Sequence, residues 1–293
     1  MEKVIAEVFE RYPQMGLPIV EGSKNTPAFR NAVAGGEPVT EPVENFTGDA
    51  RDTFTVTVTP AGEAEILYLY HRADFENAVR CLSAFCEPID VPASMGAQTI
   101  GGLINWKKIN DHKREYFANG GFMWGEEMKR FTSVRENYRD YLIILSSGGY
   151  SAVSAEDAGR TLGRAIDEEE WREKSVCIRK YHELTHFIVR KLYPDHKEAI
   201  RDEIVADAIG LTAAFGRYET GLARLFLGLE NEVYREGGRL QNYYGEEDPA
   251  AVQARARKMI DMLAAFLDGK PAADEQAVFS LACLVEEQRV AMG

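Results

Sequence analysis

The chain has 293 residues, of which 45% are hydrophobic and 28% are charged. This composition is typical of a globular protein and excludes a disordered, collagen-like or coiled-coil chain. The 47 acidic side chains outnumber the 34 basic ones, which gives a formal net charge of −13. Because nucleic acids are held by neutralising their phosphates, we expect no nucleic-acid partner.

Cellular location is predicted from the termini, the apolar runs and the cysteines. No apolar run approaches the roughly 20 residues needed to cross a bilayer. Acidic residues interrupt the N-terminus, where a secretory signal needs a basic start and an apolar run. We therefore expect a cytoplasmic protein without a membrane partner, and no oligomeric state is predicted. Reduced thiols, not disulfides or zinc ligands, are expected at Cys81, Cys86, Cys177 and Cys283.

Residues 1–150 are predicted to form a mixed α/β region with a small sheet. Residues 2–12 favour a short helix, whereas three prolines and paired glycines favour a loop or mobile arm over residues 21–50. Alternating residues at 53–59, a turn, and apolar residues at 66–70 predict a hairpin. The remaining predicted elements are helices at 73–85 and 98–117 and a buried strand at 141–145.

Residues 151–293 are predicted to form a mostly helical domain. Proline and glycine residues separate the helical patterns from one another. The two regions together predict an α+β fold, with the strands in the N-terminal region. The predicted helices cover residues of about 154–165, 167–192, 195–216, 220–235, 249–268 and 273–290.

The most informative motif is His182-Glu183-Leu184-Thr185-His186, inside the predicted helix at 167–192. Two imidazoles four residues apart project from one face of a helix, so both can bind one tetrahedral ion. A chance match to His-Glu-x-x-His in a chain of this composition is expected on the order of 0.01 times. The motif therefore predicts a metal site at His182 and His186.

A third ligand is predicted on the next helix. Glu203, Asp207 and Gly210 follow one another at intervals of four and three residues, beside an apolar stripe. Gly210 would let this helix approach the histidine helix closely. We expect Glu203 to complete the metal site, and Asp207 to accept the free ring N–H of a metal-binding histidine, namely His182.

These two helices resemble those of thermolysin-like zinc metallopeptidases, the gluzincins. That family carries His-Glu-x-x-His on one helix and Glu-x-x-x-Asp on the next, which here span residues 182–210. The resemblance implies one Zn²⁺ per chain, bound by His182, His186 and Glu203, and a peptide or protein substrate. It also implies that Glu183 activates the zinc-bound water as the general base and that Asp207 supports a ligand histidine.

The sequence departs from this family in one respect that matters for catalysis. No histidine follows His196, so the downstream histidine that stabilises the transition state has no counterpart. Tyr193, Tyr243 and Tyr244 are the alternative oxyanion donors. Two other functions stay open: a metal-stabilised binding or regulatory protein without turnover, and a non-peptidase amide hydrolase with the same triad. Histidine and carboxylate ligands also suit manganese or iron.

Overall fold

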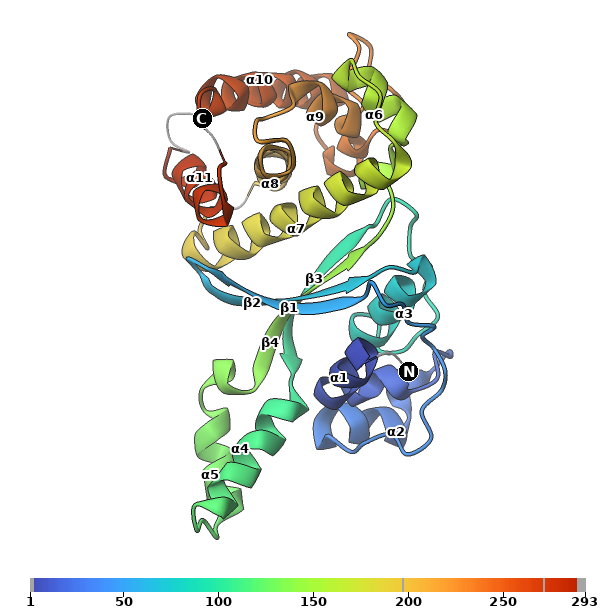
Figure 1. The fold of residues 1–293 in the computed structure, drawn as a ribbon, viewed down its shortest axis with the longest axis vertical. Coiled ribbons are helices and arrows are strands. Elements are labelled where there is room, and N and C mark those ends of the chain that lie inside the picture. Colours follow the sequence, from blue (N-terminus) through green and yellow to red (C-terminus); the bar gives the residue numbers. More distant parts are fainter. Residues whose placement is uncertain (1–2, 197, 271, 289–293) are drawn as a thin grey trace. The chain divides into compact units, whose positions relative to one another are not determined.

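The computed structural model describes residues 3–196, 198–270 and 272–288 and divides the chain into two compact units. The predicted α+β class is confirmed, because the described residues form many helices and one small sheet (Figure 1). Unit 1 comprises Met1–Thr57, Ala64–Pro92 and Ala97–Ser146, and unit 2 comprises Val58–Glu63, Ala93–Gly96 and Ser147–Gly293.

The sheet has four strands in the order β1-β2-β4-β3. The predicted hairpin and buried strand are both present, and β4 pairs in parallel with β2 and antiparallel with β3. Only the tip of the hairpin belongs to unit 2. The strands are β1 (Thr53–Thr59), β2 (Gly62–Leu69), β3 (Ala97–Ile104) and β4 (Arg139–Ser146).

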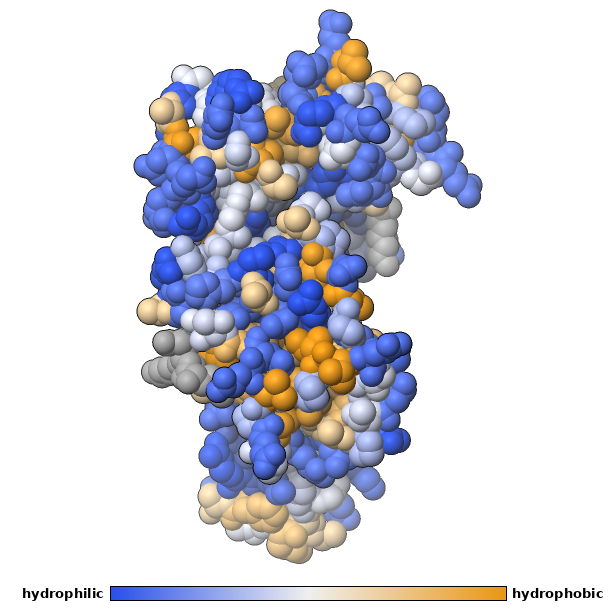
Figure 2. Space-filling view, turned by 90° about the vertical axis from the view of Figure 1, so that its right-hand side faces the viewer, coloured by the Kyte–Doolittle hydropathy of each residue, from blue (hydrophilic) through white to orange (hydrophobic). Residues whose placement is uncertain are grey.

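In the part of unit 1 that the structure describes, the chain forms five α-helices in addition to the sheet. Apolar side chains are exposed around the turn between the fourth and fifth helices, where Phe122 is 84% exposed. Figure 2 shows a light-orange patch at the lower end of the view, where Figure 1 draws this turn. The helices are α1 (Lys3–Arg11), α2 (Pro27–Arg30), α3 (Arg72–Leu82), α4 (Trp106–Ala118) and α5 (Trp124–Thr132).

Two predictions for unit 1 need correction. Residues 21–50 are not one continuous loop, because they contain α2, a 3₁₀ turn at Ser23–Asn25 and a π-helical turn at Asn31–Gly35. The predicted helix at 98–117 is wrong in its first part, since Ala97–Ile104 is a strand that pairs with β4, with one irregularity between Gly101 and Leu103. Glycines in this segment weaken a helix, and the helix begins only where Asn105 accepts a hydrogen bond from the Lys108 N–H at 3.0 Å.

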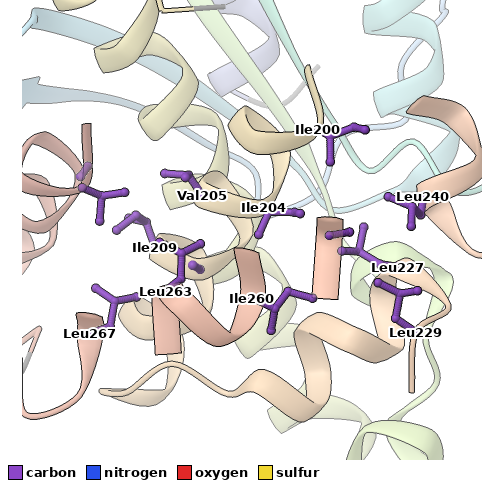
Figure 3. Packing of buried hydrophobic residues seen from close by; sticks show 14 of the residues in the cluster. Ile200, Ile204, Val205, Ile209, Leu227, Leu229, Leu240, Ile260, Leu263 and Leu267 are labelled. Carbon is purple, nitrogen blue, oxygen red and sulfur yellow. The ribbon is translucent and has the colours of Figure 1, made fainter. Parts of the chain in front are cut away.

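The described residues of unit 2 form six α-helices around apolar cores. In the core shown in Figure 3, side chains of α8, including Ile204 and Ile209, pack against side chains of α10, including Ile260 and Leu263. The helices are α6 (Ala155–Leu162), α7 (Glu168–Leu192), α8 (Ala199–Phe215), α9 (Thr220–Leu227), α10 (Pro249–Leu267) and α11 (Glu275–Glu287).

The helix predicted at 220–235 is too long. Gly228 adopts a left-handed conformation with φ of 77°, and the Leu229 N–H returns to the Arg224 carbonyl at 2.7 Å, which ends α9. The helix predicted from residue 195 begins at Ala199, and residues 289–290 of the last predicted helix lie outside the described residues. None of the described helices has the length and apolar character that a bilayer crossing requires.

Candidate metal centre

Helix α7 supplies the two histidines of the predicted motif. Its start is fixed by Asp167, whose side chain accepts a hydrogen bond from the Glu170 N–H at 2.8 Å. Acidic residues in the first turn and basic residues in the last turn complement the helix dipole. Because they lie one turn apart on the buried side of α7, His182 and His186 are only 7% and 8% exposed.

Helix α8 supplies the carboxylates and packs closely against α7. A Cβ atom at Gly210 would lie 2.6 Å from the backbone carbonyl oxygen of Ile178, so only glycine allows this approach. The same face of α8 turns Glu203 and Asp207 towards the histidines. The sequence therefore specifies the close packing that brings side chains of both helices together.

The nitrogen and oxygen atoms of three predicted ligands converge. The His182 and His186 Nε2 atoms are 3.1 Å apart, and Glu203 oxygens lie 3.2 Å from His186 Nε2 and 3.6 Å from His182 Nε2. Bond lengths of about 2.0–2.1 Å at a tetrahedral zinc ion separate neighbouring ligand atoms by about 3.3 Å. The separations run to different oxygens of Glu203 and lie near this value, so the three side chains form a group that could hold a metal ion.

Asp207 contacts the ring of His182 from the other side. Its Oδ1 atom accepts the Nδ1–H at 2.9 Å, and it also accepts the hydroxyl hydrogen of Tyr150 at 2.6 Å. The Tyr150 hydroxyl oxygen lies 3.0 Å from His182 Nδ1, and Arg239 donates to that oxygen at 3.1 Å and forms an ion pair with Asp207. With its hydrogen on Nδ1, His182 has the lone pair of Nε2 available to bind a metal ion.

The charges of the site shift several pKa values. Burial acts to raise the pKa of Glu203, but the hydrogen bond and charge of His186 and the charge of His182 hold it well below its usual range. Burial acts in the same way on Asp207, and the charge of Arg239 with the hydrogen bond from His182 gives it a lowered pKa. Both carboxylates therefore stay ionised near neutral pH, as a metal centre requires.

The other predicted site residues differ in their contacts with the triad of His182, His186 and Glu203. Glu183 is half-buried next to His182. Burial acts to lower the pKa of His182, but the hydrogen bond with Asp207 and the charges of the neighbouring carboxylates, of which Glu183 contributes least, raise it overall. Burial and then the charge and hydrogen bond of Glu203 raise the pKa of Tyr243, which indicates that this phenol lies beside Glu203. Tyr193 stacks on His196, and Tyr244 accepts a hydrogen bond from Gln253 at 3.0 Å. Of the three tyrosines, Tyr243 is the one whose pKa is raised by Glu203, and Tyr193 lines a cavity together with His186 and Glu203.

Two residues of the site were not predicted from the sequence. Tyr150 precedes the helical domain, and Arg239 lies on a short 3₁₀ helix, η6 (Arg239–Tyr243), between α9 and α10. Neither stands at a fixed spacing from the histidine motif. The sequence offered one chemical indication of Arg239. A buried Asp207 that contacts a histidine needs a balancing cation, and Arg239 is a basic residue in the polar segment that contains Tyr243.

A cavity of about 590 Å³ adjoins the triad within unit 2, since His186 and Glu203 both line it. Its wall includes apolar Val189 and aromatic Tyr193 together with the polar side chains of His196 and Asp202. The volume is within the range of about 300–1,000 Å³ typical of small-molecule sites. The triad is therefore accessible to a ligand although both histidines are buried.

Comparison with known proteins defines the family but not an activity. Residues 2–275 match the model of a family of unknown function, DUF7005, and the chain belongs to this family. No curated protein and no solved structure matches the chain.

Proposed function

We propose that this protein is a zinc-dependent hydrolase of peptide or amide bonds, similar in its centre to the gluzincin metallopeptidases. The observation that carries the proposal is the convergence of His182, His186 and Glu203 atoms at 3.1–3.6 Å from two consecutive helices. A zinc ion held by these side chains would lower the pKa of a bound water towards about 7 and polarise the carbonyl under attack.

The chain's own residues then have distinct roles. Glu183 accepts a proton from the attacking water and delivers it to the leaving amine. Tyr243, beside Glu203, donates a hydrogen bond to the carbonyl oxygen as negative charge develops. Burial raises the pKa of the Tyr243 phenol further, which keeps it protonated as a donor at neutral pH. Asp207 and Arg239 hold His182 with its hydrogen on Nδ1.

The cavity beside the site supports a substrate class, and the cysteines support a cellular location. The adjoining cavity of about 590 Å³ can take the residue on one side of the scissile bond. We also assign the activity to the cytoplasm, because all four cysteines are free thiols, the state maintained in a reducing compartment.

The test is hydrolysis of a mixed peptide pool by zinc-loaded protein. We expect Glu183→Gln to keep its zinc and to lose roughly 10²- to 10⁴-fold in rate, because the general base is removed. Glu168→Gln, at an exposed glutamate in the first turn of the same helix, is the matched control and retains full activity. Unchanged hydrolysis by Glu183→Gln would show that the assigned base is wrong.

A second function is favoured by one observation, the absence of any histidine after His196. A binding or regulatory protein stabilised by the same metal centre needs no oxyanion donor. In that case, removal of the metal lowers the melting temperature while no peptide in the pool is cleaved by the loaded wild-type protein.

A further inference from the structure

The loop that carries Tyr150 is fastened to the same helix that carries the histidines. The Tyr150 N–H donates to the Ser175 hydroxyl at 2.9 Å, and the Trp171 indole donates to the Val153 carbonyl at 2.8 Å. Trp171 and Ser175 are 1% and 0% exposed, so both contacts are shielded from water. Helix α7 therefore holds residues 147–153 at both sides of Tyr150.

Arg179 adds a third contact between α7 and this loop. The guanidinium donates to the carbonyls of Gly148 at 2.8 Å and Gly149 at 2.7 Å, and it lies 5.7 Å from the centre of the Tyr150 ring. Arg179 is 4% exposed, so this bidentate arrangement is buried. The three contact residues, Trp171, Ser175 and Arg179, are spaced four residues apart, and the histidines follow at 182 and 186 on the same helix.

The backbone of the loop is held in an unfavourable conformation. Ser151 and Ala152 have φ values of 55° and 59°, in the left-handed region that residues other than glycine seldom adopt. A Cβ atom at Gly149 would overlap the backbone carbonyl of Val153, so the turn also requires glycine there. Such strain persists only where the surroundings fix it, and it is common at functional sites.

The side chain that this loop delivers is the Tyr150 phenol. The residue is 5% exposed, and its hydroxyl lies 3.0 Å from His182 Nδ1 and donates to Asp207 at 2.6 Å. The His182 Nδ1–H thus has two oxygens to contact, one from α8 and one from the loop. Two contacts from different directions fix the rotation of the imidazole ring, which a single carboxylate leaves freer.

We infer that Tyr150 is a positioning residue of the metal centre, and that Arg179 acts on this centre through the 147–153 loop. The inference rests on the proposed function, since it requires that His182 binds a metal ion. It assigns one helix two tasks: α7 supplies two ligands and also anchors the loop whose tyrosine orients one of them.

The first test measures zinc affinity by competition with a chromogenic chelator. We expect Tyr150→Phe to weaken zinc binding by roughly 10- to 100-fold, the usual effect of losing a group that orients a ligand. The cobalt-substituted variant should also show an altered visible absorption spectrum. Tyr181→Phe is the matched control, because its hydroxyl, on the same helix, donates to Glu275 and not to the metal centre.

The second test asks whether Arg179 acts through Tyr150. Arg179→Met should weaken zinc binding in the wild-type background and cause no further loss in the Tyr150→Phe background. If the Arg179 variant does not fold, Ser175→Ala removes the acceptor of the Tyr150 N–H in its place. Melting temperatures of the metal-free proteins separate general destabilisation from a change at the site.

The outcomes distinguish this inference from the proposed function. A wild-type protein that binds no zinc overturns both. A wild-type protein that binds zinc, with Tyr150→Phe equal to it in affinity and cobalt spectrum, overturns only the role of Tyr150. If Arg179→Met weakens zinc binding equally in the wild-type and Tyr150→Phe backgrounds, Arg179 does not act through the loop.

Discussion

Each unit contains a buried cluster of charged groups, and the two clusters are built differently. In unit 1, Tyr12 donates to Asp140 at 2.7 Å and lies 3.1 Å from Glu65. Arg11 donates to the other Glu65 oxygen at 3.2 Å, and Asn105 and Lys108 both donate to Asp140 at 2.5 Å. Every carboxylate oxygen of this cluster therefore faces a donor supplied by the chain.

In unit 2 the corresponding atoms are two imidazole nitrogens and a carboxylate that face one another. The His182 and His186 Nε2 atoms and the Glu203 carboxylate meet within 3.6 Å of one another. If both imidazoles carry their hydrogen on Nδ1, the two Nε2 lone pairs and the Glu203 carboxylate favour a shared cation, whereas the unit 1 carboxylates already face arginine and lysine. The comparison contrasts a buried network with donors of its own and a network that, in our proposal, binds an ion.

The largest expected effect distinguishes the clusters by their dependence on metal. Chelation should lower the free energy of unfolding by about 4 kcal/mol if free zinc is 1,000-fold above its dissociation constant. Urea titrations with and without chelator measure this loss. His186→Ala should show no such loss, whereas Glu65→Gln should show it in full. An equal loss in His186→Ala would place the metal elsewhere.

The next prediction sharpens the assignment of the oxyanion donor. Tyr243→Phe should lower kcat by roughly 10²- to 10³-fold, because one hydrogen bond to the developing charge is lost. Tyr244→Phe is the neighbouring control, since its hydroxyl contacts Gln253 and not the triad. Steady-state kinetics on a cleaved peptide compare the two variants. Equal rates in both would remove Tyr243 from the mechanism.

A smaller effect is expected in unit 1, where the charged cluster should make the stability of the protein depend on pH. Burial, and then the charge of Asp140, raise the pKa of Glu65 from 4.5 to about 7. The folded protein therefore keeps a proton that the unfolded chain releases, so stability falls as pH rises from about 4.5 to about 7. Relative to Glu65→Gln, the wild type should lose about 3 kcal/mol across this window.

Urea titrations of both proteins at several pH values check this difference. The Gln side chain keeps the shape of Glu65 but has no proton to release, so its stability should change less across the window. Parallel pH profiles for the two proteins would contradict the assignment of the retained proton to Glu65.

The convergence of the two histidines was predictable because their spacing is local. His182 and His186 lie one helical turn apart, and Gly210 marks the close approach of the partner helix. Tyr150 and Arg239 were not predictable, since they reach Asp207 from loops 57 and 32 residues away in sequence. The end of α9 was predicted wrongly for a related reason. Gly228 ends this helix through its backbone conformation, which apolar periodicity does not reveal.

The central claim is that His182, His186 and Glu203 bind one zinc ion. Elemental analysis of protein purified without added metal tests it most directly. We expect about one zinc ion per chain in the wild type and only background zinc in His186→Ala, as for a single site with three protein ligands. A wild-type protein without bound metal, or a His186→Ala variant that retains the full amount, would contradict the account.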